Sequence, residues 1–460
     1  MQTPYTYRDP TLSLWQSAVA QVQRNRKSVQ ARMSLLSSMN FAVPTLLSEE
    51  TLMSPAHLLG QPLAAGQSVS PETLSAPLPS SAASTEALGA AGVLVDCAKT
   101  AAQFLWAEMT GDKEKSDLYA SELKFAVCDA GGWAECLTAY LAFKASCGTL
   151  PYRPNQDVVV NLGQNATIAI IGDWGTGDQV AINVLQEVAK FKPDVLIHLG
   201  DVYYASTQGE ANDNFLAICR QILGASIPLF SLCGNHDMYS GGDGYYWLID
   251  HIGQQSSYFC LQNDYWQFLA MDTGHNDHDP VTVSTNMTSL VNIPGWSEAN
   301  WHLNKIQQAG NRRIALFSHH QLFSPFSSVG TMNNQQYAYN PNLYSNFQSV
   351  LSKIDIWFWG HEHTLALYDP YMGLVRGRCV GASAVPVFTN QQQYSADNGL
   401  LTYPDTPLPG WNPSAILANN GTDYNNAFAI MTLNGASATV NYYQVPILKV
   451  ASQLPFTDTI

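Results

Sequence analysis

The hydrophobic pattern divides the chain into two parts near residue 150. In the first part, apolar residues recur at helical spacing from Leu12 to about Leu36, which predicts one amphipathic helix. Residues 43–85 are rich in Ser, Pro and Ala without periodicity and predict a linker, and helical patterns return at 86–110 and 114–147. We therefore expect residues 1–150 to form a helical N-terminal region that contains a linker at 43–85.

From about residue 155 the pattern changes to short apolar runs of β type that alternate with helical stretches. The runs expected to be strands are 167–172, 195–199, 227–232, 266–271, 314–317 and 356–359, with later runs at 374–380, 427–433 and 438–443. Helical spacing occupies 178–190, 211–223, 298–309 and 342–352. This alternation predicts a layered α/β domain with partly parallel sheets, which we assign to residues 155–450.

Charged residues are scarce in this sequence. The 460 residues hold 21 Lys and Arg against 36 Asp and Glu, a formal net charge of −15, and charged residues make up only 12% of the chain. An acidic surface with few lysines argues against nucleic acid as a partner, because phosphate backbones are bound by clustered Lys and Arg. No apolar run approaches the roughly 18 residues of a transmembrane helix, and no secretion signal is apparent. The low charge density by itself favours an exported protein.

A potential metal ligand follows five of the predicted strands. The five segments read Gly172-Asp173-Trp174-Gly175, Gly200-Asp201-Val202-Tyr203-Tyr204, Gly234-Asn235-His236-Asp237, Ser318-His319-His320 and Gly360-His361-Glu362-His363. Ligand sites in open α/β sheets lie beyond the carboxyl ends of strands, which is where all five segments fall. Carboxylate, amide, imidazole and phenol groups without cysteine suit Fe, Mn or Zn. A carboxylate such as Asp201 can bridge two ions about 3.5–4 Å apart, the usual arrangement for phosphoester hydrolysis.

Each motif taken alone also has a plain structural interpretation. Gly-Asp and Asn-His pairs are common turn residues, and His361 and His363 would then be two surface histidines on an extended segment. Five such motifs in order, each after an apolar strand, favour one shared metal centre. The segment from His275 to Asp279 follows the strand at 266–271 and either extends the active site or forms a polar surface loop. We favour the surface loop, because nothing in the sequence fixes its geometry.

With these motifs, residues 167–445 resemble the calcineurin-like metallophosphoesterase superfamily and, within it, the purple acid phosphatase branch. Most superfamily members carry a metal-binding His two residues after the first Asp, where this chain has Gly175. The GDxxY pattern of purple acid phosphatases supplies a tyrosine instead, matched here by Asp201 and Tyr204. The resemblance implies an αββα sandwich of two mixed sheets, and it leaves residues 1–150 unassigned.

The resemblance also implies two metal sites that share Asp201. Four residues would hold Fe(III) at the first site, namely Asp173, Asp201, Tyr204 and His363. Four would hold Fe(II), Zn or Mn at the second, namely Asp201, Asn235, His319 and His361. The implied reaction is hydrolysis of a phosphate monoester by a metal-bound hydroxide, without a protein nucleophile, on a small phosphorylated substrate.

Three further residues receive catalytic roles from the same resemblance. His236 would protonate the leaving oxygen or hold the phosphate, with Asp237 orienting it. His319 is taken as the ligand of the adjacent pair, so His320 is expected to face outward, toward substrate. Gln321 stands where the family has Pro, and GNHD stands where plant members have GNHE, so their substrate contacts are not carried over.

Three other functions remain compatible with the sequence. One is a phosphodiesterase that acts on nucleotides or phospholipid headgroups, because the superfamily uses one centre for both reactions. Another is a non-catalytic binding protein on the same fold, although all seven ligand positions carry competent residues. The third gives residues 1–150 an independent role in delivery or partner binding, with an unknown partner.

Overall fold

The computed structural model describes residues 148–460, apart from 157, 280–287, 333–334, 392, 398, 405 and 448–451, together with scattered residues between 107 and 146. The helix expected at 12–36 and the linker expected at 43–85 lie outside the described residues. Residues 139–140 and 142–145 are helical, within the stretch expected at 114–147. The division of the chain at residue 150 stays a prediction.

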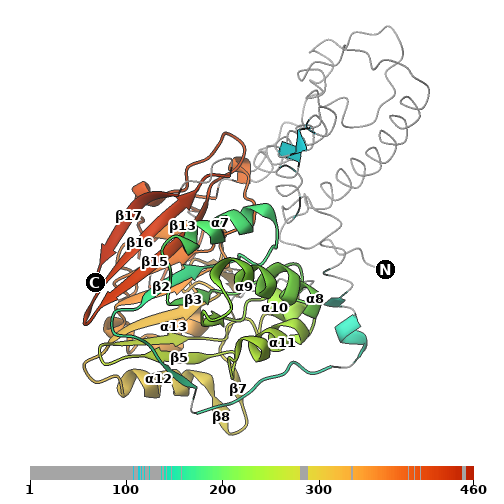
Figure 1. Ribbon diagram of the computed structural model, residues 1–460. Helices are drawn as coiled ribbons and strands as arrows, with labels where there is room; N and C mark the ends of the chain where they lie inside the picture. The colour runs from blue at the N-terminus through green and yellow to red at the C-terminus, as the bar shows by residue number, and fades with distance from the viewer. Residues whose placement is uncertain are drawn as a thin grey trace, which may run out of the picture. The chain divides into compact units, whose positions relative to one another are not determined.

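Two mixed β-sheets form the described body of the protein (Figure 1). The strand order is β17-β16-β15-β2-β3-β4 in the six-stranded sheet and β1-β5-β6-β9-β12-β14-β13 in the seven-stranded sheet. Strands β2, β3 and β4 run parallel, as do β6, β9, β12 and β14. The predicted αββα arrangement of two mixed sheets is confirmed.

The six-stranded sheet comprises β2 (Thr167–Ile171), β3 (Val195–His198), β4 (Leu229–Ser231), β15 (Asn426–Asn434), β16 (Ser437–Val445) and β17 (Gln453–Thr459). The seven-stranded sheet comprises β1 (Val159–Asn161), β5 (Phe259–Gln262), β6 (Trp266–Ala270), β9 (Arg313–Ser318), β12 (Ile356–Trp359), β13 (Leu365–Leu367) and β14 (Gly377–Val380). Two short hairpins pair β7 (Asn292–Ile293) with β8 (Trp296–Ser297) and β10 (Gly330–Met332) with β11 (Gln335–Tyr337).

The helices are α7 (Gln179–Ala189), α8 (Gln208–Glu210), the π-helix η2 (Ala211–Leu216), α9 (Ala217–Leu223), α10 (His236–Tyr239), α11 (Asp243–Ile252), α12 (Glu298–Gln307) and α13 (Pro341–Phe347). Short 3-10 turns occur at η3 (Leu351–Lys353), η4 (Thr389–Gln391) and η5 (Pro413–Ala415). Helix α7 begins at an N-cap, where the Asp178 side chain accepts from the Ala181 N–H at 2.9 Å. No helix among the described residues is long and apolar enough to span a membrane.

Alternation along the strands separates two apolar layers. Ile168 and Ile170 of β2 belong to the cluster that fills the space between the sheets, whereas Ala169 and Ile171 belong to a second cluster with α7 and α9. Side chains at successive strand positions point to opposite faces, so a strand buried on both faces reads as a continuous apolar run. This is why the runs at 167–172 and 195–199 show no polar alternation.

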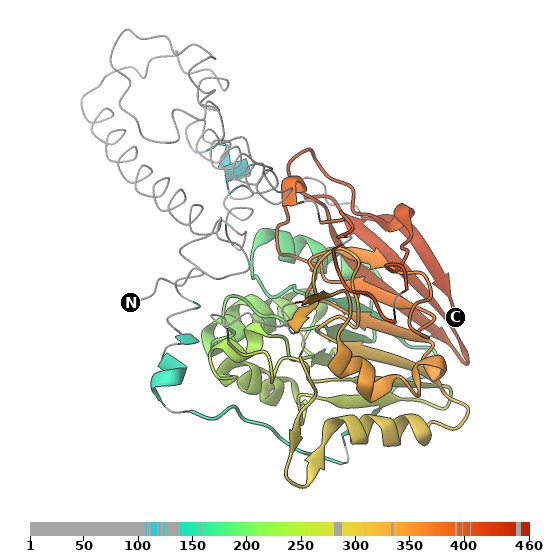
Figure 2. The ribbon, with the colours of Figure 1, turned by 180° about the vertical axis from the view of Figure 1, so that it is seen from behind.

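The outer face of the seven-stranded sheet is covered by α12 and α13, on the side opposite α7 (Figure 1, Figure 2). Phe347 of α13 packs edge-on against Trp357 of β12, with ring centroids 5.6 Å apart. The Gln267 amide of β6 donates to the Lys305 carbonyl of α12 at 2.9 Å. Each sheet therefore has one face against the other sheet and one against helices.

A buried ion pair connects the two sheets away from the strand ends discussed below. The Arg378 guanidinium of β14 donates to both carboxylate oxygens of Asp458 in β17, at 2.7 and 3.0 Å. The Tyr442 hydroxyl of β16 donates to the same carboxylate at 2.7 Å. Burial works to raise the pKa of Asp458, but the Arg378 guanidinium outweighs burial and lowers it. Because every charge is hydrogen-bonded, this pair fixes the relative position of β14 and β17.

Several observed elements were not expected from the sequence, namely β1, β5, β13, β17 and α11. Strand β5 spans only four residues, Phe259–Gln262, and only three residues separate it from β6. Helix α11 begins after Gly242 and ends at Gly253, both in the left-handed region.

His198 of β3 is a buried histidine in the six-stranded sheet, and its pKa reports how strongly the interior of the protein disfavours a charged side chain. Its Nδ1 lies 3.0 Å from Ser231 Oγ, and its Nε2 is buried with no hydrogen-bond partner among the described atoms. Burial lowers the pKa of His198 to about 3 from its ordinary value of 6.5. The unfolded chain therefore binds a proton that the folded protein excludes, so stability is present above pH 6.5 and falls as the pH drops below it.

We predict that the free energy of unfolding falls by about 1 kcal/mol more between pH 6.5 and 5.5 in the native protein than in His198→Gln. Urea unfolding at the two pH values measures the difference. Equal losses in both proteins would mean that His198 is protonated without cost in the folded state.

Candidate metal centre

The five predicted ligand segments leave the carboxyl ends of β2, β3, β4, β9 and β12. Three of these strands belong to the six-stranded sheet and two to the seven-stranded sheet. Parallel strands bring their carboxyl ends to one edge of a sheet. Two groups of metal-binding character gather there among the described residues, each with ligand atoms within 4.8 Å of one another: Asp173, Asp201 and His319, and His319, His320 and His361.

One group of side chains surrounds the hydroxyl of Tyr203. This oxygen lies 3.2 Å from Asp173 Oδ1, 3.3 Å from Asp201 Oδ2 and 3.1 Å from His363 Nε2. His363 Nε2 is also 3.4 Å from Asp173 Oδ1. Two carboxylates, a phenol and an imidazole thus converge on one small volume, which we call the Tyr203 group.

A second group surrounds Asn235 Oδ1. This oxygen lies 3.0 Å from His319 Nε2 and 3.0 Å from His361 Nδ1, and the two ring nitrogens are 3.2 Å apart. Asp201 Oδ2 lies 3.4 Å from His319 Nε2. We call these residues the Asn235 group, and Asp201 is shared by both groups.

Hydrogen bonds outside the Asn235 group fix which atoms face inward. His319 Nδ1 lies 3.0 Å from the Leu199 carbonyl, an acceptor, so Nδ1 carries the proton and Nε2 presents a lone pair. The Asn235 amide nitrogen donates to the Tyr239 hydroxyl at 2.6 Å, which turns Oδ1 toward the histidines. The lone pairs of His319 Nε2 and Asn235 Oδ1 therefore face one another at 3.0 Å, an arrangement that repels unless a cation lies between them.

The spacing of these atoms fits a metal ion. Ligands bound to one ion at about 2.0–2.2 Å lie about 2.8–3.6 Å apart for bond angles between about 90° and the tetrahedral angle. The observed separations of 3.0–3.4 Å in the Asn235 group fall in that range. The donor set of carboxylate, amide, imidazole and phenol suits Fe, Mn or Zn.

The pKa shifts of Asp201 and His319 also favour a bound positive charge between the two groups. Burial, followed by the charges of Asp173 and Asp237, raises the pKa of Asp201 well above its ordinary value. Burial and then the neighbouring His320 lower the pKa of His319 well below its ordinary value. With protein charges alone, the carboxylate is driven to take up a proton and the imidazole to lose one. A bound cation relieves the carboxylate repulsion and needs the imidazole neutral.

The backbone at the centre is held in an unusual conformation. Asp173, Asp201 and His361 have φ values of 55°, 72° and 63°, in the left-handed region that non-glycine residues seldom adopt. Such conformations cost about 1–3 kcal/mol each and persist where surrounding contacts enforce them. At Asp173 and His361 the enforcing contact is mutual, because the His361 N–H donates to Asp173 Oδ2 at 2.9 Å.

Two glycines allow the segments to approach one another. A Cβ on Gly234 would lie 2.1 Å from Asp201 Oδ1, and a Cβ on Gly360 would lie 2.5 Å from Asp173 Oδ2. Real contacts of a Cβ with another heavy atom are not this short, so any side chain at either position displaces a carboxylate. The glycines before Asn235 and His361 therefore leave room for ligands that come from other strands.

Asp237 fixes two of the segments through their backbones. Its carboxylate accepts from the N–H groups of Gly234 at 2.8 Å, Asp201 at 2.9 Å and Val202 at 3.2 Å. It was expected to orient His236, and the contacts instead show it bridging the ends of β3 and β4. Burial raises its pKa to about 6, although the backbone N–H groups oppose the shift.

His236 is oriented by a carbonyl oxygen in place of Asp237. Its Nδ1 lies 2.6 Å from the Tyr204 carbonyl, which fixes the proton on Nδ1, and Nε2 lies 4.0 Å from Asp201 Oδ2. The ring packs between Tyr203 and Tyr239, with centroid distances of 4.5 and 4.7 Å. His236 thus presents Nε2 to the side of the centre at which Asp201 is shared.

The tyrosine of the cluster is Tyr203, one residue before the Tyr204 that the sequence motif predicted. Tyr204 is buried and contributes through its backbone, because its N–H donates to Glu210 and its carbonyl faces His236. The prediction of Tyr204 as the phenol of the first site is therefore corrected to Tyr203. The loop leaves β3 through Gly200 and Asp201, both with positive φ, so strand alternation no longer predicts which tyrosine points inward.

The prediction that His320 faces outward is wrong, since its side chain is fully buried. Its ring Nδ1 lies 3.0 Å from Thr273 Oγ1, and its Nε2 lies 2.9 Å from Asp277 Oδ2. The segment from His275 to Asp279, interpreted as a surface loop, therefore reaches the centre through Asp277. The position of this segment in the sequence could have identified the contact, because the segment follows the end of β6 as the five ligand segments follow their own strands.

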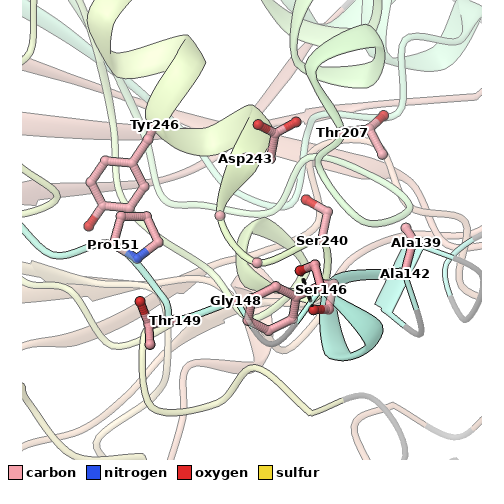
Figure 3. Close-up of a pocket in the computed structure, with 13 residues that line it drawn as sticks. Ala139, Ala142, Ser146, Gly148, Thr149, Pro151, Thr207, Ser240, Asp243 and Tyr246 are labelled. Atoms are coloured by element: carbon pink, nitrogen blue, oxygen red, sulfur yellow. Dashed lines mark hydrogen bonds between the residues drawn. The ribbon is translucent and has the colours of Figure 1, made fainter.

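A separate hollow of about 620 Å³ lies beside α11 (Figure 3). Residues between 139 and 151 line one side of it, and Thr207, Ser240, Asp243 and Tyr246 line the other. Its lining contains none of the metal-centre residues and no Lys or Arg, and Asp243 contributes a carboxylate. An acidic hollow of this kind does not suit a phosphate ester.

The family described as calcineurin-like phosphoesterase matches residues 166–365. This range contains all five strand-end segments and every residue of the Tyr203 and Asn235 groups. Over these residues the chain is similar to the calcineurin-like phosphoesterase family, and the same residues carry a candidate His/Asp metal site. No curated protein matches the sequence.

Several solved structures show a general likeness. The structure of purple acid phosphatase PPD1 from yellow lupin (Lupinus luteus) seeds is 13% identical, with 65% of this chain and 54% of that chain covered and a TM-score of 0.43. The structure of PhoD is 10% identical, with 67% of this chain and 69% of that chain covered and a TM-score of 0.40. The structure of GAP50, the anchor in the inner membrane complex of Plasmodium, is 12% identical, with 65% of this chain and 89% of that chain covered and a TM-score of 0.38. The chain spans about half the length of the lupin protein.

Gly234→Ala tests whether the close approach of the β3 and β4 segments is needed to hold metal. The added Cβ collides with Asp201 Oδ1, the residue shared by both groups, so we predict about a tenfold or greater loss of metal affinity. Gly209→Ala in α8 is the matched control, because nothing lies within 4 Å of its added Cβ. Elemental analysis of the two purified variants measures the effect, and equal metal contents would contradict the packing argument.

Proposed function

We propose that the chain is a binuclear-metal phosphatase of the purple acid phosphatase type, which hydrolyses phosphate monoesters. The observation that carries the proposal is the Tyr203 hydroxyl, which lies within hydrogen-bond distance of Asp173, Asp201 and His363. A phenol among the ligands distinguishes this branch from the superfamily members that use a histidine after the first Asp.

The space around Gly175 supports the same assignment. A Cβ on Gly175 would lie 2.7 Å from Val202 Cα and 2.8 Å from the Asp201 carbonyl oxygen. The loop after β3 occupies the volume that a side chain at position 175 would need. A histidine cannot be accommodated there, and the same loop carries Tyr203 into the centre in its place.

The two groups would hold two ions that share Asp201. In the proposal the Tyr203 group holds Fe(III), and the Asn235 group holds Fe(II), Zn or Mn. When bound, two such cations supply Lewis-acid stabilisation of phosphate charge and lower the pKa of a coordinated water. With only 21 Lys and Arg in the chain, the cations and nearby histidines are the source of positive charge for the substrate.

His236 is proposed to handle the substrate proton. With the Nδ1 proton directed to the Tyr204 carbonyl, protonation at Nε2 makes the ring a cation on the side of Asp201. From Nε2 the proton can pass to the leaving oxygen, or the N–H can hold a phosphate oxygen. The flanking rings of Tyr203 and Tyr239 keep the imidazole in this orientation. Asp237 acts indirectly, by holding the backbone of both loops.

The visible spectrum tests the phenol ligand. A phenolate bound to Fe(III) gives a charge-transfer band in the green, and we predict that Tyr203→Phe abolishes it in iron-replete, oxidised protein. Tyr204→Phe is the matched control and should keep the band, because it leaves the Tyr203 hydroxyl in place among Asp173, Asp201 and His363. A band that survives in Tyr203→Phe, or is lost in Tyr204→Phe, would overturn the assignment.

Matched assays on a nitrophenyl phosphate and on its bis-ester test the reaction type. We predict that kcat/KM for the monoester exceeds that for the diester by about tenfold or more, since a dianionic monoester gains more from two cations. A preference for the diester would indicate a phosphodiesterase. Metal-replete protein without activity on either ester would indicate a binding protein on this fold.

A further inference from the structure

The loop after β6, residues 272–279, holds both ring nitrogens of His320. Asp277 Oδ2 lies 2.9 Å from Nε2, and Thr273 Oγ1 lies 3.0 Å from Nδ1. The His320 backbone N–H also donates to Thr273 Oγ1, at 3.1 Å. The His320 side chain is fully buried and that of Asp277 is 14% exposed, so His320 itself does not reach a substrate. We call residues 272–279 the β6 loop.

The fixed ring of His320 packs on two members of the Asn235 group. Its centroid lies 4.4 Å from that of His361, with an interplanar angle of 40°, and 4.9 Å from that of His319, at 85°. The His361 backbone has a φ of 63°, and its ring must still bring Nδ1 to 3.0 Å from Asn235 Oδ1. A rotation of His320 would therefore change the volume available to the His361 ring.

The β6 loop also touches the other side of the Asn235 group. A Cβ on Gly274 would lie 2.1 Å from the Gly234 carbonyl oxygen and 2.7 Å from Cys233 Sγ. The backbone of the β6 loop is thus packed directly against the segment that carries Asn235. One loop supports two of the four strand ends that supply this group, those of β4 and β9, whereas the contacts described for the Tyr203 group involve other residues.

We propose that Asp277 is a positioning residue for the Asn235 group: through His320 it holds the His361 ring in place and thereby sets the affinity of this group for its cation. The inference rests on the two-ion centre of the proposed function. A positioning role differs from a general structural role because it is selective. Loss of Asp277 should weaken binding of the ion in the Asn235 group and leave binding of the ion in the Tyr203 group unchanged.

The test is a Co(II) titration of the metal-free full-length chain, followed by calorimetry and by visible absorption of the bound ion. His361→Ala identifies the binding step that belongs to the Asn235 group. In Asp277→Ala we expect that step to weaken about 10- to 100-fold, while the other step stays within about twofold. Asp277→Asn should fall between this variant and the native protein, because its amide oxygen still accepts a hydrogen bond from His320.

Two further variants keep the result interpretable. Asn276→Ala removes a neighbouring side chain of the same loop that bonds to Ser289, and it should leave both steps unchanged. Thr273→Val removes the other partner of His320 and should reproduce the selective loss if Asp277→Ala does not fold. Equal weakening of both steps, or no change in either, would overturn the role of Asp277. Native protein that binds fewer than two ions would instead contradict the proposed function, and this inference with it.

Discussion

Asp201 lies between two groups of side chains whose lone pairs face one another, and most features of this edge of the protein follow from that arrangement. The Tyr203 group and the Asn235 group bring oxygen and nitrogen atoms to within 3.0–3.4 Å of one another, and at His319 Nε2 and Asn235 Oδ1 two acceptors face each other. Repulsion of this kind is stable only with positive charge in the middle. Asp173, Asp201 and His361 adopt left-handed backbone, and glycines lie at the closest approaches between segments. Both features are the local cost of holding the groups together.

The fold supplies rigidity at the points where this repulsion acts. Both sheets end at the same edge, and each contributes ligands directly from buried strands, so no ligand depends on a long loop. The apolar layer between the sheets and the buried pair of Arg378 with Asp458 keep the sheets in register. Asp237 then joins the ends of β3 and β4, and Asp277 joins the end of β6 to that of β9. Acidic side chains thus hold backbone N–H groups and an imidazole in place here, in addition to forming part of the candidate metal site.

Much of this centre could be predicted from the sequence, because strand ends are marked by a change from apolar runs to Gly-Asp, Gly-Asn or His-rich segments. The choice between adjacent residues could not be predicted. Tyr203 and Tyr204 follow a backbone that has already left the strand conformation, so the direction of each side chain depends on tertiary contacts. His320 was expected outside for the same reason, whereas the β6 loop covers it.

The contacts of the β6 loop could not be predicted from the sequence, because they join residues that lie far apart in the chain. Asp277 lies 43 positions before His320, and no periodicity or motif connects them. Short elements such as β5 were missed because four residues carry little pattern of their own. The helices expected before residue 107 lie outside the described residues, so their part in the protein is still a prediction.

The central claim is that one centre at the joined edges of two sheets holds two ions that share Asp201. Anomalous diffraction from crystals of metal-replete protein, measured at the iron edge and at the edge of the second metal, tests it directly. We expect two peaks on either side of the Asp201 carboxylate, one against the Tyr203 oxygen and the other against Asn235, His319 and His361. A single peak, or two peaks with the Tyr203 oxygen remote from both, would contradict it.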